Sequence, residues 1–231
     1  MKTKFLVLFI SIAFFSSCSD DEDGENVFDG STSSLQDLFS DEVVQALNDL
    51  NFSINEGTNP PNLEGTFFIS QVILTDTNVE SDNIGSRFFD QRYTFFDQNN
   101  SNNTIDFDGE QLNIDGSLES TLQGTGSFIS GSDNSFSIFL VVLDENIESG
   151  AQAEIAYSIS GTITSEGIAN FEVAIIMLDN MGNPTGEFID NGLGRRFLDS
   201  DGFSELLSDP SAIDYKVRSE KSEMSTLEAI N

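Results

Sequence analysis

The stretch SFSIFLVVL at residues 135–143 decides the fold, because it predicts a β-strand that is apolar on both faces. Successive side chains of a strand point in opposite directions. The even-numbered apolar residues from Phe136 to Val142 therefore share one face, and the odd-numbered residues from Phe139 to Leu143 share the other. A strand of this kind needs a packed layer on each side, so we expect a core beneath the sheet and a second layer above it.

Similar segments on both sides of this strand predict an antiparallel meander. Each alternates between apolar and polar residues or is continuously apolar, and clusters of Gly, Asn, Asp or Ser separate them at short intervals. We expect an all-β fold, an antiparallel up-and-down β-barrel of about 8–10 strands, with a β-sandwich as the alternative. The expected strands span residues 66–74, 87–96, 104–108, 111–114, 126–129, 135–143, 154–163 and 168–178, and residues 187–203 add one or two more.

One helix is predicted before the sheet, over residues 35–50, either straight or bent at Ser40. Apolar residues recur there at intervals of three and four, which gives a single apolar stripe, and Ser40 can cap a helix that begins at Asp41. Pro60 and Pro61 follow and cannot continue a helix. The stripe needs a surface to pack on, so we expect the helix to cover the outer face of the sheet.

The N-terminus resembles the export signal of a bacterial lipoprotein. Lys2 and Lys4 precede an apolar run over residues 5–15 that is too short to span a bilayer. Residues 15–18, Phe-Ser-Ser-Cys, resemble a lipobox, in which small residues precede a Cys that receives a diacylglycerol. The resemblance implies a signal peptide over residues 1–17 and lipidation of Cys18, which anchors the protein in a membrane. An ordinary signal peptide with an incidental Cys is the alternative.

An acidic segment, Ser-Asp-Asp-Glu-Asp-Gly at residues 19–24, follows the Cys. It resembles the signal that sends lipoproteins of Bacteroidota to the outer face of the outer membrane, so an extracellular location is expected. A merely flexible acidic tether is the alternative, which leaves the periplasmic face open. We expect a disordered tether over residues 18–33, one folded domain over residues 34–207 and a polar tail over residues 208–231.

The composition of the chain restricts its partners and its chemistry. It contains 40 acidic and 9 basic residues, for a formal net charge of −31, so nucleic acid and bare anionic lipid are repelled. Such an excess of acids indicates solubility first and cation capture second. The chain has no His, and therefore lacks the usual general base and the commonest zinc ligand. We expect a non-enzymatic protein, with a hydrolase as a less favoured alternative.

Two short patches of the folded domain resemble lipocalins and related calycin barrels. Gly65-Thr66-Phe67 is similar to the Gly-x-Trp opening of the first lipocalin strand, with Phe67 in the place of the Trp. Arg195 or Arg196 corresponds to the late Arg that packs across that aromatic ring in lipocalins. The disulfides of the family are missing, since the chain has one Cys. The resemblance implies a barrel-like shape.

The sequence GLGRRF at residues 192–197 is the first candidate for a ligand site, because it places two cations together in a chain that has few. Arg195 and Phe197 share one face of a strand. An inward guanidinium can pair with the carboxylate of an amphiphilic ligand. A structural ion pair between Arg195 and one of the many acids is the alternative.

The acidic turn that follows is a candidate Ca²⁺ site. Asp199, Asp201 and Glu205 supply three carboxylates, and Gly202 permits a sharp turn. The spacing does not match an EF-hand, and an acidic turn without metal is the alternative. No other cofactor is expected.

These features predict a lipid-anchored outer-membrane or cell-surface protein that binds a small amphiphilic ligand. A structural or adhesive protein that uses the outer surface of the sheet is the alternative. The barrel interior distinguishes the two, because a cavity above roughly 300 Å³ admits a ligand whereas a filled barrel favours a scaffold.

Overall fold

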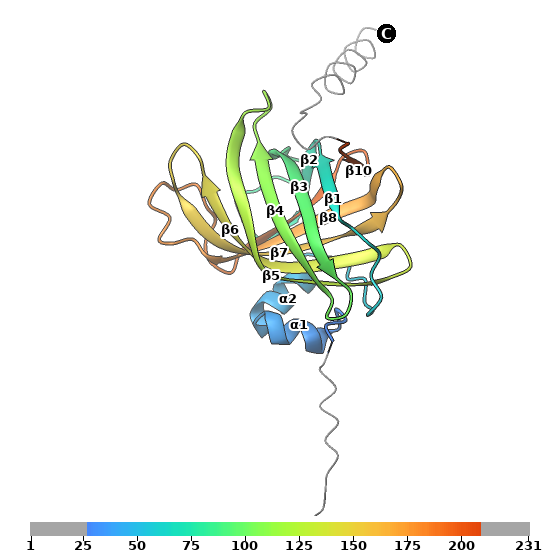
Figure 1. Ribbon diagram of the computed structural model, residues 1–231. Coiled ribbons are helices and arrows are strands. Elements are labelled where there is room, and N and C mark those ends of the chain that lie inside the picture. Colours follow the sequence, from blue (N-terminus) through green and yellow to red (C-terminus); the bar gives the residue numbers. More distant parts are fainter. Residues whose placement is uncertain (1–26, 209–231) are drawn as a thin grey trace, which may run out of the picture.

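The computed structural model describes residues 27–208 of the chain. The expected signal peptide, Cys18, the tether as far as residue 26 and the tail from residue 209 lie outside the described residues. The described part folds into an all-β barrel with helices on one side, as the sequence predicts (Figure 1).

The helices are α1 (Thr32–Leu38) and α2 (Asp41–Asp49), and the strands are β1 (Gly65–Ile69), β2 (Val72–Thr77), β3 (Asp90–Asn99), β4 (Thr104–Leu112), β5 (Leu118–Ser132), β6 (Ser135–Asn146), β7 (Gln152–Ile163), β8 (Gly167–Asp179), β9 (Gly194–Asp199) and β10 (Phe203–Leu206).

The sheet is antiparallel and closes on itself. Its order is β10-β1-β3-β4-β5-β6-β7-β8-β9-β2, and β10 also pairs with the start of β8. The β2 strand joins the segment that leads into β3, because Ile73 bridges Arg87 and the Phe88 N–H donates to the Val72 carbonyl at 2.8 Å. The sheet therefore closes into a ring in two places. The β10 strand links β1 to β8, and the pair β9 and β2 links β8 to the segment that leads into β3.

Two bends make this double closure possible. Gln71, with a φ of 61°, separates β1 from β2, and Gly202, with a φ of 77°, lies between β9 and β10. The bends lie against each other, since the Ser200 N–H donates to the Gln71 carbonyl at 3.2 Å. The single strand predicted over residues 66–74 is thus two strands, because Gln71 leaves the extended conformation.

Two other predicted strands have different bounds in the structure. The segment at residues 111–114 does not form its own strand: Gln111 and Leu112 end β4, and β5 begins after a turn. The β5 strand is 15 residues long, and only residues 126–129 of it were predicted. The sequence pattern misses its first half because Ser120, at an inward position, interrupts the apolar alternation.

The N-terminal layer contains two helices instead of the predicted single helix over residues 35–50. Phe39 and Ser40 are both extended, with ψ angles of 151° and 158°, so the chain leaves helical geometry between α1 and α2. Ser40 occupies the N-cap position of α2, as predicted. Asp41 and Glu42 in the first turn favour a new helix start, because they complement its positive dipole end.

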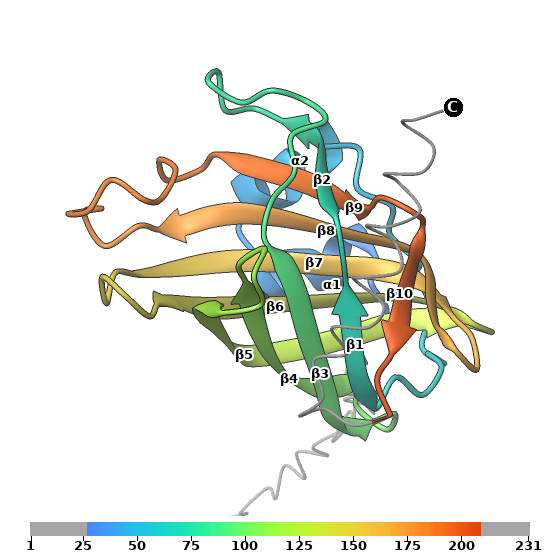
Figure 2. The same cartoon turned by 90° about the horizontal axis from the view of Figure 1, so that it is seen from above.

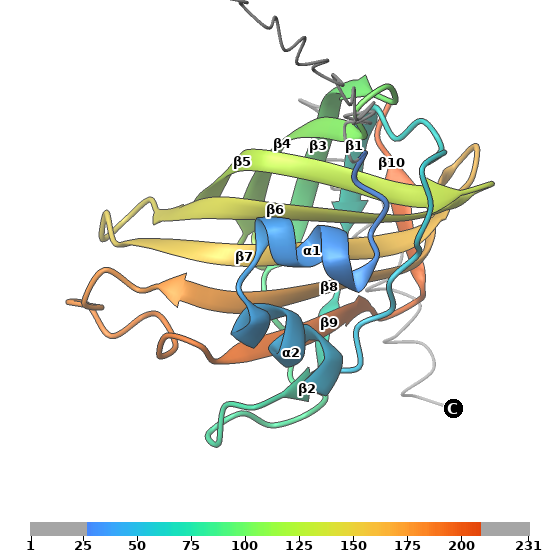
Figure 3. The same cartoon turned by 90° about the horizontal axis from the view of Figure 1, so that it is seen from below.

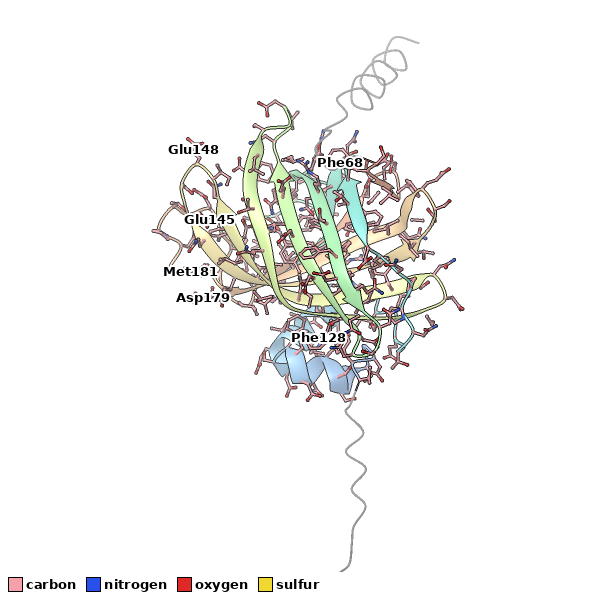
Figure 4. The ribbon with its side chains drawn as sticks, viewed as in Figure 1. Phe68, Phe128, Glu145, Glu148, Asp179 and Met181 are labelled. Atoms are coloured by element: carbon pink, nitrogen blue, oxygen red, sulfur yellow. The ribbon has the colours of Figure 1, made fainter. Side chains whose placement is uncertain are left out.

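The helices cover the outer face of β6, β7 and β8 (Figure 3). The sheet contributes the small residues Ala156 and Ala174, which allow close approach, and Phe139, whose ring lies 5.6 Å from that of Phe28. Phe128 of β5 borders this layer (Figure 4). The two-sided apolar strand therefore has the two layers that its sequence requires. The helical contribution consists of Leu35, Phe39, Val43, Val44, Leu47 and Leu50.

Aromatic rings fill one end of the barrel interior. We call this cluster, Phe67, Tyr93, Phe95, Phe107 and Phe171, the aromatic plug. Its ring centroids lie 5.0–6.0 Å apart, within the range of favourable aromatic contacts. The short turns after β3, β5 and β7 lie at this same end. The plug closes the interior here and leaves space only toward the opposite end.

The outer helical layer should contribute strongly to stability. Leu47 is 1% exposed and packs against the sheet, so Leu47→Ala should lower the free energy of unfolding by about 2–4 kcal/mol. Asn48→Ala, on the exposed side of α2, is the matched control and should change it by less than about 0.5 kcal/mol. Urea denaturation measures both. Equal effects of the two substitutions would contradict the packing described.

Candidate ligand-binding cavity

A cavity of about 310 Å³ occupies the barrel at the end opposite the aromatic plug. We call this the open end. Four loops surround it, at residues 78–89, 113–117, 147–151 and 180–193. The β6–β7 and β8–β9 loops project from the same side of the barrel (Figure 2). The volume of this cavity lies at the lower end of the range typical of small-molecule pockets, roughly 300–1,000 Å³.

One wall of the cavity is apolar. It is formed by alternate residues of neighbouring strands, which point inward because the strand period is two. The β8–β9 loop adds Phe188 and Ile189, which pack against the core and partly cover the cavity. The strands contribute Ile155 of β7, Val173, Ile175 and Met177 of β8, and Phe197 of β9.

The opposite wall and the floor are polar. Gln91 and Gln111 hydrogen-bond with the hydroxyls of Tyr93 and Tyr157, respectively. Burial raises the pKa of both tyrosines, so their hydroxyls stay protonated at neutral pH. This arrangement keeps uncharged donors and acceptors at the base of an apolar wall.

Asp144 is the most deeply buried of the carboxyl groups that line this cavity. Its side chain is 5% exposed, and its Oδ1 atom has no hydrogen-bond partner in the described chain. Burial raises the pKa of the Asp144 carboxyl to about 6; a hydrogen bond with Ser120 lowers it, and the nearby Glu119 and Glu187 raise it further. An ionised carboxylate therefore lines the cavity at neutral pH, and one of its oxygens is buried without a hydrogen-bond partner in the described chain.

Arg195 and Phe197 both line the cavity, as predicted from their shared strand face. The Arg195 guanidinium is already paired, with Nε and Nη2 each donating to an Asp82 carboxylate oxygen at 2.7 Å. It also lies 5.1 Å from the centre of the Phe88 ring. The alternative expectation, a structural ion pair, describes this geometry, and the pair ties the β2–β3 loop to β9.

The lipocalin-like contact between a late Arg and the first-strand aromatic is not formed. Arg195 packs on Phe88, and Arg196 points to the outer face, where it pairs with Asp76 and with Glu172. Phe67 lies in the aromatic plug, at the far end of the interior. The structure therefore has a barrel fold, but it lacks the contact that the resemblance to lipocalins implied for these residues.

The structure does not bring the three predicted calcium ligands together. Asp199 is buried and its Oδ2 accepts a hydrogen bond from Ser204 at 3.0 Å, whereas Asp201 is exposed in the turn. Burial raises the pKa of Asp199 to about 7, and the neighbouring Asp201 adds to the rise. Glu205 lies on β10 opposite Phe68. Residues 27–208 contain no group of three or more acidic, His or Cys side chains suited to a metal ion.

A second hollow, of about 340 Å³, lies beside Asp199 and Glu172. Its lining is mostly polar, and the Glu172 carboxylate is already used within the chain. Its Oε1 accepts from the Ser53 N–H and the Ser160 hydroxyl, and its Oε2 accepts from Arg196. The hollow therefore lacks the apolar wall of the first cavity, which we take as the candidate site.

Asp144 is a site residue that the sequence analysis missed, although the sequence contains a signal for it. The predicted strand was ended at Leu143, where the apolar run stops. The alternation that places Phe136 and Val142 inward continues by one step to Asp144, so an acid occupies a core-facing position. Gln91, Gln111 and Ser120 carry no comparable signal, because only the pairing of their strands shows that they face the same space.

Comparison with known proteins assigns no relative to this chain: no protein-family model matches it, and no curated protein or solved structure matches it significantly. Within residues 27–208, neither helix has the length or the apolar character needed to cross a membrane.

Replacing the buried carboxylate should stabilise the fold above pH 6. Because the pKa of Asp144 is about 6 in the folded chain and near 3.9 when unfolded, the folded state binds the extra proton between these values, and ionisation costs stability above them. Asp144→Asn should therefore raise the free energy of unfolding at pH 8 by roughly 1–3 kcal/mol. The gain should shrink as the pH falls from 6 to 4.

Urea denaturation at a series of pH values measures this difference. Glu145→Gln is the matched control, because Glu145 is the exposed neighbour of Asp144 and its replacement changes the net charge equally. A gain for Asp144→Asn that does not vary with pH, or one that Glu145→Gln reproduces, would contradict the burial of an ionised Asp144.

Proposed function

We propose that this protein is a non-enzymatic, lipid-anchored outer-membrane protein that binds a small amphiphilic ligand in the open end of its barrel. The observation that carries the proposal is the cavity of about 310 Å³ with one apolar wall and one polar wall. A ligand with an apolar body and a polar head matches both surfaces, since the body can cover Val173 and Met177 while the head reaches Asp144.

The entrance to the cavity is also suited to amphiphiles. Each surrounding loop carries an exposed apolar residue: Ile84 in the first loop, Ile114 in the second, Ile147 in the third and Met181 in the fourth. Met181 is seen at this end of the barrel in Figure 4. Apolar residues that gather around a cavity entrance typically mark an interaction site. They provide a first contact for an apolar ligand before it enters.

The proposal of a lipid anchor is based on the sequence that precedes the described residues. A thiol acylated at Cys18 would hold the domain at the membrane by a tether, so the barrel needs no membrane contact of its own. The acidic residues after it favour the extracellular face. An adhesive role of the loops is the second candidate function, favoured by their exposed apolar residues.

The cavity should bind prodan, a small uncharged fluorophore, with a blue shift and increased emission. Val173→Phe should abolish this binding because the larger ring fills the cavity. It should cost less than about 1 kcal/mol of stability, whereas the same enlargement in a filled core costs about 1–3 kcal/mol. Leu143→Phe, on the outer face of β6, is the control and should bind prodan normally.

Fluorescence titration and urea denaturation of the three proteins test this proposal. If the unchanged chain leaves prodan emission unaltered, the cavity is not a ligand site and the adhesive role takes precedence. If Val173→Phe binds as well as the unchanged chain, prodan binds elsewhere and the proposed site is wrong.

Lipidation makes a separate prediction. Cys18→Ser should prevent incorporation of radioactive palmitate and release the protein from the membrane fraction, since no other Cys exists in the chain to carry a thioether-linked lipid. Metabolic labelling followed by fractionation in a Gram-negative host measures both. Unchanged labelling and membrane retention would disprove the anchor without affecting the proposal for the cavity.

A further inference from the structure

The charges around the cavity differ from those expected from the sequence. Arg195 was the candidate partner for a ligand carboxylate, but both hydrogen bonds of its side chain to Asp82 are already formed, at 2.7 Å each. Asp82 is itself only 8% exposed, so the pair is largely shielded from solvent. The cation of this cavity is therefore neutralised within the chain.

The acids of the cavity are in a different situation. Asp144 has an oxygen without a hydrogen-bond partner in the described chain, and the charged groups that shift its pKa, Glu119 and Glu187, are acids that also line the cavity. Ser120 supplies one hydrogen bond to the carboxylate. A buried carboxylate is costly unless it is paired, so an unpaired one in a cavity favours a positively charged group from outside.

The entrance has the same sign of charge. Glu145 lies near the end of β6, Glu148 lies in the loop that follows, and Asp179 ends β8 on the other side of β7 (Figure 4). All three side chains are exposed. Acids at a cavity entrance raise the local concentration of cations and repel anions, which would hinder a fatty acid and assist an amine.

We infer that the cavity selects amphiphiles with a protonated amine as the head group, which the Asp144 carboxylate binds. This inference rests on the proposed function, because it specifies the ligand of the same cavity. The ammonium ion pairs with the Asp144 carboxylate, and the apolar body lies against Ile155, Val173 and Met177. An alcohol can make the same hydrogen bond without the charge, and a carboxylate would be repelled by three acids.

The test is displacement of prodan by three ligands that share one alkyl chain: octylammonium, octanol and octanoate. The chain from residue 18 onward is produced without lipid and assayed at about pH 7.5, where Asp144 is ionised. Octylammonium should bind about tenfold or more tightly than octanol, the usual gain from a charge-assisted hydrogen bond. Octanoate should bind more weakly than either.

Asp144→Asn should remove the preference for octylammonium over octanol while prodan still binds, since the side chain keeps its size and loses its charge. Glu145→Gln, which removes an exposed acid at the next position, should retain most of the preference. The pair of variants separates a direct contact with Asp144 from a general effect of negative charge.

The outcomes distinguish the two proposals. If prodan binds but octylammonium is no better than octanol, or if Asp144→Asn keeps the preference, the inference is overturned and the amphiphile-binding function stands. If octanoate binds best, the head group is anionic and the inference is likewise overturned. If neither prodan nor any of the three ligands binds, the proposed function fails, and the inference fails with it.

Discussion

Closure of the sheet at two adjacent bends is the constraint on which the rest of the structure depends. At Gln71 and near Gly202 the chain leaves extended geometry, so β8 can pair with β10 at one end and with β9 at the other. The Asp90 carboxylate fixes the first bend by accepting the Gln71 N–H at 3.0 Å. Without the bends, one junction of the ring would leave strand edges unpaired, and such edges invite association with other chains.

Closure gives the barrel two different ends. At the plug end the rings pack so tightly that a Cβ atom added to Gly109 would lie 2.8 Å from the Phe107 ring. At the open end the corresponding inward positions carry Gln91, Gln111 and Asp144, which are smaller or polar. The free space and the polar side chains of the interior therefore lie at the same end of the barrel. This arrangement is the basis for the proposed binding function.

For the proposed binding site, the positions of the charged groups matter more than the net charge of the protein. Most of the acids in residues 27–208 are exposed to solvent, whereas Asp144 is held in the interior at a cost in stability. The Arg195 guanidinium, which lines the same cavity, is already paired with Asp82. Functional sites commonly contain buried polar groups that lower the stability of the fold. In the proposed function, the bound ligand restores this stability.

The sequence by itself determined the fold class, the covering layer and the inward direction of Arg195 and Phe197. These are local properties, since the period of apolar residues decides which face of a strand or helix is buried. Tertiary structure decided the rest. Asp82 reaches Arg195 across 113 residues, and no local pattern indicates that pairing.

The break between α1 and α2 and the bend at Gln71 also depend on contacts with distant segments. The cavity is decided in the same way, because a hollow is the space that several strands leave between them after pairing. The sequence specifies which residues face the interior, and only the register of the closed sheet decides whether they meet or leave room for a ligand.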